Sequence, residues 1–591
     1  MSRTSTPRLR WVLVSCVVVV TTLLAGCAPA PAQPQVVEKT VVVTQEVAKE
    51  VVVTKEVAKE VVVTKEVEKQ VVVTPTPLPP AAKKGGTFIS YIAEDPTSLN
   101  GIIGNDGYSL PIIWLSQNPL TLGGENGGSV LAGDLAEKWE LSPDGLTWTF
   151  YLHKDVKWQD GQPFTADDVL FTFQEIQDEK VQTGGFRDRF MINGKPIKFE
   201  KVDDYTIKAT LDQPIASFAS AISVPIIPKH LLEGQDINKA AFNQLPVGTG
   251  PFKVAEWKSG ESVTLEANPN YFRGAPYLDK YVYRIIPNQD AAAVALQSGE
   301  IDFANVRGKD VARFVGNPDF TVKTAPVDLT RMIILNDAKP FFKDARVRQA
   351  LSLAVDRQAV IDAAEQGYGT IADSVFDQPV SIYKPGKLQA PQQDLDKANA
   401  LMKEAGWVDT NGDGIVEKDG QVFKILLEYS PGWTFMAPVA PLIQAWWKKI
   451  GVDATVRTYD SASFVDKVMR SSTVDKPFDA FINGWGYFAT DPDAYASYFA
   501  PSKPGLSFLG YENAQVKDLF DKARVATDPS ARSAMYEQAE KILWDDVAFI
   551  PLYYPQRIFV YNNRVGLDEA GLDANRFPPF QHPEKLYMRQ K

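Results

Sequence analysis

The sequence predicts a mixed α/β fold divided among several domains. Residues 147–152 (TWTFYL) alternate in polarity as a half-buried strand does. Residues 423–429, 439–450 and 452–457 are typical of a strand, a helix and a second strand. This order is a βαβ unit, which places two strands in an open α/β sheet. The chain of 591 residues is also too long for one hydrophobic core and suggests two to four domains.

The N-terminal residues predict an export signal followed by a lipid anchor. Three arginines precede an apolar run from Trp11 to Leu24, which is shorter than the roughly 20 residues that a membrane-spanning helix needs. The run ends in Leu24-Ala25-Gly26-Cys27, where small residues directly precede a cysteine. We expect residues 1–26 to be a signal peptide and Cys27 to be diacylated as the new N-terminus. The alternative is a plain signal peptide with a chance cysteine.

Residues 27–83 are predicted to form a stalk. The tetrapeptide VVVT recurs every ten residues between positions 41 and 74, and its period fits neither a heptad nor an 11-residue coil. Residues 75–80 (PTPLPP) favour a stiff, polyproline-like segment. Fully extended, the stalk could reach on the order of 150 Å. Association between neighbouring stalks is the alternative.

The remaining chain begins with short strands and turns. Residues 86–91 are typical of a strand, and residues 142–145 (SPDG) of a hairpin turn. Thr165, followed three positions later by Asp168, predicts a capping box at the start of an apolar helix. Asp528, followed by a proline at the first helical position, predicts the start of another helix.

Composition excludes several classes of protein. The chain has 62 basic and 73 acidic residues, hence a net charge of −11, and this argues against a nucleic-acid-binding protein. Two cysteines and three histidines are too few for a disulfide scaffold or an iron–sulfur protein, and the three histidines lie far apart in the sequence. We identify no catalytic signature and no cofactor motif, so the sequence predicts a protein that is not an enzyme.

The most specific motif is residues 144–173, DGLTWTFYLHKDVKWQDGQPFTADDVLFTF. It closely resembles the signature region of the bacterial extracellular solute-binding proteins of the oligopeptide, dipeptide and nickel type (family 5), which are the binding components of ABC importers. Further matching segments follow in the order of the family. They are residues 246–252, 268–272, 341–350 and 550–554.

The resemblance implies a two-lobed, periplasmic-binding-protein-like α/β fold with an extra small domain. A hinge would connect the lobes, and the ligand would bind in the cleft between them. Lobe I would comprise residues 84–124, 247–327 and 549–591. The extra domain would be residues 125–246, and the second lobe residues 328–548.

The resemblance also points to a ligand-binding segment at residues 483–493, NGWGYFATDPD. In the peptide binders of this family, an aspartate three residues after the tryptophan pairs with the ammonium group of the peptide. Phe488 occupies that position here. Because a buried ammonium group needs a counter-charge, a peptide would require another anion, from Asp491, Asp493 or Asp95. Alternatively, three aromatic side chains form a stacking surface for a sugar or an apolar ligand: Trp485, Tyr487 and Phe488. A third possibility is that they are only core residues.

Residues 409–417 (DTNGDGIVE) match the start of a calcium-binding EF-hand loop. The oxygen ligands would be Asp409, Asn411 and Asp413, with a glycine at the sixth position. The twelfth position, which requires a glutamate, is Gly420. We therefore favour a surface hairpin turn over a calcium site.

The sequence as a whole predicts a monomeric, lipid-anchored solute-binding protein on the outer face of the cell membrane, working with the permease subunits of an ABC transporter. A peptide is the first expected ligand and an oligosaccharide the second. Nickel is third because histidines are scarce. A secreted hydrolase and a purely structural surface protein are the rival classes, and neither has a supporting motif in the folded part of the chain.

Overall fold

The computed structural model describes most of the chain from residue 82 onward. All described residues belong to the unit Thr74–Lys591. Cys27, the predicted signal peptide and nearly all of the predicted stalk lie outside them. No helix within the described residues has the length and apolar character that a membrane crossing requires. The described residues are 82–122, 132–183, 186–192, 194–327, 329–376, 388–464, 467–468, 478–485, 491–501, 509–572, 576 and 578–590.

A four-stranded sheet joins the start of the described chain to a much later segment. The strand order is β11-β12-β13-β2, in which β13 and β2 run parallel. Strand β2 confirms the strand predicted at residues 86–91, shifted by one residue. The strands are β2 Thr87–Ile92, β11 Phe252–Lys258, β12 Ser262–Ala267 and β13 Lys280–Ile285. A small three-stranded sheet has the order β1-β25-β24, with β1 Ala82–Lys83, β24 Val565–Gly566 and β25 Tyr587–Arg589. Helix α1, Leu110–Ser116, follows β2 in the chain, and helix α5, Gln289–Gln297, follows β13.

The signature region contributes strand β6 and most of helix α2 to a part of the fold whose antiparallel sheet has the order β5-β6-β10-β9. The alternation predicted for residues 147–152 is confirmed, because every second side chain of β6 is buried. The capping box of Thr165 and Asp168 is also confirmed, and the backbone N–H of Thr165 donates to Asp168 Oδ2 at 3.0 Å. The elements are β5 Ala136–Leu141, β6 Thr147–Leu152, α2 Ala166–Gln177, β9 Lys198–Asp203, β10 Thr206–Thr210, α3 Phe218–Ala221 and α4 Lys229–Leu232.

The largest sheet has eight strands and contains the predicted βαβ unit. Strands β20 and β21 pair in parallel, which confirms the unit. Its helix α9 begins three residues earlier than predicted. The added first turn contains Pro438, and a proline is tolerated in the first turn of a helix. The strands are β14 Phe303–Val306, β15 Phe320–Pro326, β16 Thr330–Leu335, β17 Gly369–Ile371, β20 Lys424–Tyr429, β21 Asp453–Thr458, β22 Ala480–Trp485 and β23 Ile550–Asn562.

Helices follow or precede these strands in the chain. The helix predicted to start after Asp528 is confirmed as α13, and the side chain of Asp528 accepts a hydrogen bond from Ala531 N at 2.7 Å. The longer helices are α6 Ala345–Leu353, α7 Arg357–Glu365, α8 Leu395–Glu404, α9 Met436–Lys448, α12 Ala514–Val525 and α13 Pro529–Asp545.

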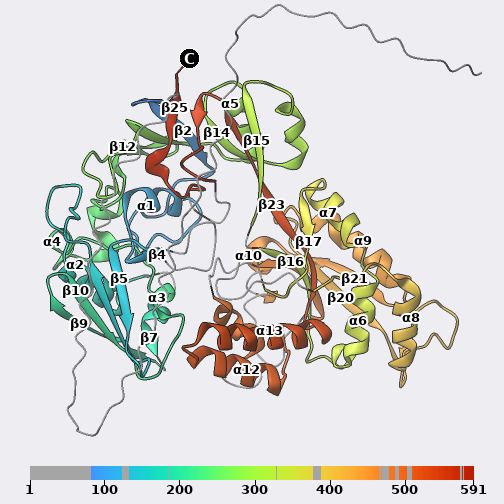
Figure 1. The fold of residues 1–591 in the computed structure, drawn as a ribbon. Coiled ribbons are helices and arrows are strands. Elements are labelled where there is room, and N and C mark those ends of the chain that lie inside the picture. The colour runs from blue at the N-terminus through green and yellow to red at the C-terminus, as the bar shows by residue number, and fades with distance from the viewer. Residues whose placement is uncertain are drawn as a thin grey trace, which may run out of the picture. The chain divides into compact units, whose positions relative to one another are not determined.

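Strand β23 links two of the buried apolar clusters (Figure 1). Its first residues pair with β16 and contribute Leu552 to a cluster built from β16, β20, β22 and the surrounding helices. Its later residues pair with β15, and Phe559 packs in the cluster that contains strands β2 and β11–β13. The chain also passes from β15 to β16 beside this strand, since Val327 N donates to Pro555 O at 3.3 Å. Two neighbouring chain segments therefore connect the two cores, as a hinge requires.

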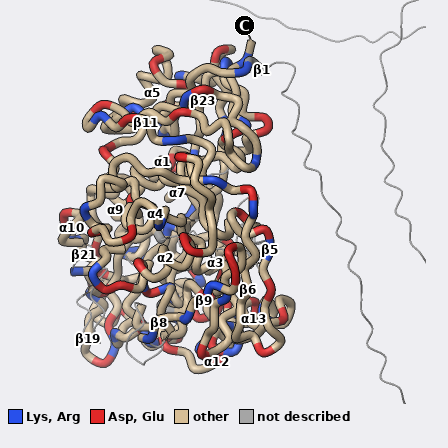
Figure 2. Tube along the Cα trace, turned by 90° about the vertical axis from the view of Figure 1, so that its left-hand side faces the viewer, with Lys and Arg blue, Asp and Glu red and all other residues tan. Residues whose placement is uncertain are grey.

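Charged residues of both signs are interspersed over the described elements. Figure 2 shows this mixture around β21, β9 and α12. On α12, Lys517 pairs with Asp521, and Lys522 pairs with Asp518, each one turn away. Exposed pairs of this kind contribute little to stability.

Candidate functional site

The predicted ligand-binding segment begins at the end of strand β22. This strand pairs with β16, so that Trp485 lies opposite Thr330, and Gly484 opposite Arg331. The structure thus places the backbone of Trp485 at the edge of the largest core. Tyr487 and Phe488 lie outside the described residues, and their predicted role stays a prediction.

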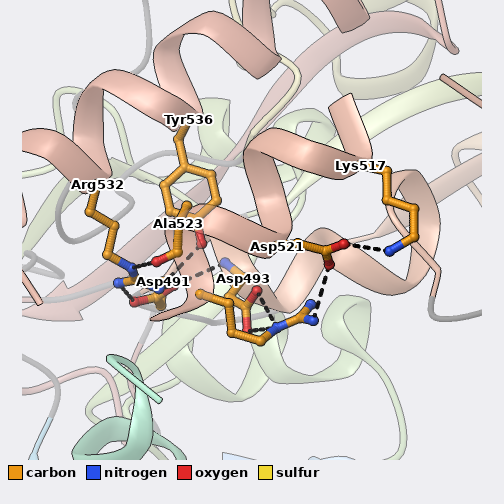
Figure 3. Close-up of polar contacts among 8 residues, drawn as sticks. Asp491, Asp493, Lys517, Asp521, Ala523, Arg532 and Tyr536 are labelled. Carbon is orange, nitrogen blue, oxygen red and sulfur yellow. Dashed lines mark hydrogen bonds and ion pairs between the residues drawn. The ribbon is translucent and has the colours of Figure 1, made fainter. Parts of the chain in front are cut away.

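Asp491 is buried and paired with an arginine. Its carboxylate accepts two hydrogen bonds from Arg532 on α13, from Nη1 to Oδ2 at 2.5 Å and from Nη2 to Oδ1 at 2.8 Å (Figure 3). Oδ1 also accepts from the backbone N–H of Asp493 at 2.9 Å and so caps the short helix η8, Pro492–Tyr495. Bidentate pairing of this kind fixes both position and orientation.

Arg532 also donates hydrogen bonds to residues of helices α12 and α13. Its Nε donates to the carbonyl of Ala523 at 2.8 Å, and Nη2 donates to the hydroxyl of Tyr536 at 3.2 Å. Burial alone would lower the pKa of Arg532, but the hydrogen bonds and charge of Asp491 raise it above its usual value. The guanidinium therefore stays charged and ties residue 491 to helices α12 and α13.

Asp493 is paired with the neighbouring Arg524. The Nε of Arg524 donates to both carboxylate oxygens, at 3.1 and 3.2 Å. Burial raises the pKa of Asp493, and the charge of Arg524 opposes that shift. Arg524 also forms an ion pair with Asp521, with Nη1 and Oδ1 3.6 Å apart (Figure 3). The guanidinium thus lies between two carboxylates.

The third candidate anion, Asp95, also has protein partners. Its carboxylate accepts hydrogen bonds from Trp257 Nε1 at 2.8 Å, Ser259 Oγ at 2.9 Å and Gly260 N at 2.8 Å. Burial tends to raise the pKa of Asp95, but these hydrogen bonds lower it below its usual value. The carboxylate thus closes the turn between β11 and β12. Among the described residues, no hydrogen bond or ion pair joins Asp95 to Asp491 or Asp493.

The EF-hand-like loop is exposed and closed by its own backbone. Asp409 accepts from the N–H groups of Gly412 and Gly414, at 2.6 and 2.9 Å. Asn411 and Asp413 each accept from the N–H two positions later. A two-stranded hairpin, β18 Glu417–Lys418 and β19 Gln421–Val422, follows the loop. In the part of the chain that the structure describes, no three acidic, histidine or cysteine side chains are grouped as a metal site would require.

Sequence reasoning missed Arg331. It is the one charged residue in β16, whose other residues are all buried. Its guanidinium carbon lies 3.7 Å from the centroid of the Phe435 ring, and Arg331 is opposite Gly484, directly before Trp485. A lone arginine in the apolar run TRMIIL is the signal that could have identified it.

Comparison with known proteins assigns the chain to a family. A model described as bacterial extracellular solute-binding proteins, family 5 Middle, matches residues 130–506. The oligopeptide-binding protein AppA of Bacillus subtilis is 32% identical over 521 residues, which cover 86% of this chain and 92% of AppA.

Solved structures have the same fold. The substrate-binding protein CtaP of an ABC transporter from Listeria monocytogenes superimposes with a TM-score of 0.76 at 30% identity, covering 86% of this chain and all of CtaP. AppA from B. subtilis, in complex with a nonapeptide, gives a TM-score of 0.67 at 30% identity, with 86% of this chain and all of AppA covered. The predicted two-lobed α/β class is thereby confirmed.

Proposed function

Because the chain belongs to the family 5 bacterial extracellular solute-binding proteins, we propose that it captures a peptide and delivers it to the permease of an ABC importer. It is a binding protein rather than an enzyme, as the sequence predicts. The observation that carries the proposal is the similarity, over most of both chains, to a protein whose structure contains a bound nonapeptide.

An oligosaccharide is the second candidate ligand, and the pairing of the acidic residues favours it. Asp491 and Asp493 already bind buried arginines, and Asp95 closes a turn. Each would have to exchange or share its partners to bind an ammonium group. A ligand held by aromatic contacts and a few hydrogen bonds needs no such exchange.

Ligand binding is expected to stabilise the protein and to close its two lobes. At a hundredfold excess over Kd, a ligand that binds only the folded state stabilises it by about 2.7 kcal/mol. A pool of nonapeptides should therefore raise the melting temperature and reduce the radius of gyration in solution scattering. A matched pool of neutral oligosaccharides serves as the comparison. Tight peptide binding that leaves both quantities unchanged would contradict the proposed role as an import receptor.

The proposal includes a lipid anchor at Cys27 and a stalk that holds a monomeric binding unit outside the membrane. The support is the sequence Leu24-Ala25-Gly26-Cys27 after a short apolar run. Replacing Cys27 by Ala should abolish labelling by a fatty-acid probe and release the protein from the membrane fraction. If Cys27→Ala stays in that fraction, the anchor is an uncleaved apolar segment instead. Cys16→Ala is the matched control, because Cys16 lies within the predicted signal peptide.

A further inference from the structure

Arg331 reaches across strand β22 at the start of the ligand-binding segment. It is paired in register with Gly484 on one side and with Tyr553 of β23 on the other. A Cβ atom built on Gly484 would lie 2.2 Å from Nη1 and 2.8 Å from Cδ of Arg331. Only a glycine at position 484 therefore leaves room for the guanidinium in this place. The side chain lies directly beside the backbone that leads into Trp485.

The guanidinium is held by an aromatic ring rather than by an acid. It stacks on Phe435 at 3.7 Å, and its Nε atom is buried without a hydrogen-bond partner. No carboxylate of the described residues lies within 4.0 Å of it. The acid with most influence on it is Glu365, whose carboxylate accepts from the hydroxyl of Tyr553 at 2.9 Å. Burial lowers the pKa of Arg331, and Tyr553 and Glu365 only partly oppose this.

This environment contrasts with that of Arg532, which is more deeply buried and has a complete bidentate partner in Asp491. A buried cation without a counter-ion is costly in free energy. A protein that binds a solute can retain such a charge when the solute supplies the missing anion. Tyr553 uses part of the hydrogen-bonding capacity of this guanidinium. The planar fork of the remaining N–H donors fits the two oxygens of a carboxylate.

We propose that Arg331 is the receptor for a carboxylate group of the captured solute, and this inference rests on the proposed solute-binding function. If the solute is a peptide, the carboxylate is its C-terminus. If it is another organic acid, the same guanidinium binds that acid. Because Arg331 pairs with Tyr553 where β23 leaves β16, the contact would lie at a segment that joins the two cores.

The test uses calorimetry on the full-length, ligand-stripped protein with three probes. These are a nonapeptide pool without acidic side chains, the same pool amidated at the C-terminus, and citrate as a carboxylate that is not a peptide. The wild type should bind the free-acid pool at least tenfold more tightly than the amidated pool. Arg331→Gln should abolish that difference, and Arg331→Lys should restore part of it. The matched control is Arg346→Gln, which removes an exposed arginine paired with Asp344.

A stability measurement separates binding from a structural role. Since no carboxylate of the described residues pairs with the wild-type cation, Arg331→Gln should leave the melting temperature of the ligand-free protein unchanged or raise it. If Arg331→Gln does not fold, Gly484→Ala is the second variant, because its Cβ crowds the guanidinium without removing the charge. It should also reduce the preference for the free acid.

The outcomes distinguish this inference from the proposed function. Equal binding of the two peptide pools by the wild type, or an unchanged preference in Arg331→Gln, overturns the role of Arg331 and leaves peptide binding intact. Binding of citrate through Arg331, with no binding of either pool, supports the carboxylate receptor and overturns the peptide proposal. If the wild type binds none of the three probes, both are overturned.

Discussion

Replacing Arg532 by Met is expected to destabilise the protein by about 3–5 kcal/mol. The change leaves the buried carboxylate of Asp491 without its two hydrogen bonds and its counter-charge, and breaking one side of a buried ion pair typically costs this much. Denaturant unfolding, followed by tryptophan fluorescence, measures the loss. Ligand affinity should fall as well, because this pair fixes Asp491 within the predicted ligand-binding segment.

The matched control for this change is Arg524→Met. Its side chain is 29% exposed and that of Asp493 15% exposed, against 4% and 11% for Arg532 and Asp491, so its loss should be smaller. A second test asks whether the effect of Asp491→Asn on the free energy of unfolding changes sign when Arg532 is absent. Asp491→Asn should destabilise the wild type but stabilise Arg532→Met, because there it removes the unpaired charge. Additive effects of the two substitutions would show that the pair does not hold the segment.

Replacing Trp485 by Ala is expected to weaken ligand binding by about 2–4 kcal/mol, which corresponds to roughly 30- to 1,000-fold in Kd. The reason is that Phe488 stands where the peptide binders of the family have an aspartate, so that aromatic contacts should contribute most of the affinity. Calorimetry with matched free and N-acetylated peptides measures the effect. Acetylation should change the affinity little.

If an aspartate binds the ammonium group of the peptide, acetylation and Trp485→Ala should have the opposite effects on affinity. If Asp491 or Asp493 pairs with the ligand, the corresponding Asp→Asn change should weaken the binding of free peptides and spare the acetylated ones. A large loss on acetylation, together with a silent Trp485→Ala, would exclude stacking as the main source of affinity. The unfolding free energy of each variant is needed as a control, since Asp491 also stabilises the fold.

Local patterns in the sequence predicted much of the fold. The alternation in β6, the capping box at Thr165 and the βαβ unit each depend on residues close together in the chain, where propensity and spacing suffice. The observed limits of β2, α9 and β21 differ from the predicted ones by one to three residues, whereas those of β6 agree. Proline in the first turn of α9 is one cause, because a proline there neither removes a helical hydrogen bond nor clashes.

The candidate site was harder to predict because its contacts join distant residues. Asp491 and Arg532 are 41 positions apart, and Asp95 and Trp257 are 162 apart. A sequence pattern identifies an acidic residue but not the arginine that neutralises it. Three carboxylates that looked available to a ligand therefore have protein partners. Conversely, Arg331 lacks an acidic partner among the described residues, which no local pattern indicates.

Mass spectrometry of the ligand that co-purifies with the gently isolated, full-length protein identifies the captured solute. The ligand is released by mild denaturation, and the protein expressed with Trp485→Ala serves as the control for specific retention. We expect the wild type to release peptides and the variant to release far smaller amounts of them. Release of oligosaccharides without peptides, or equal release of the same peptides from both proteins, would contradict this expectation.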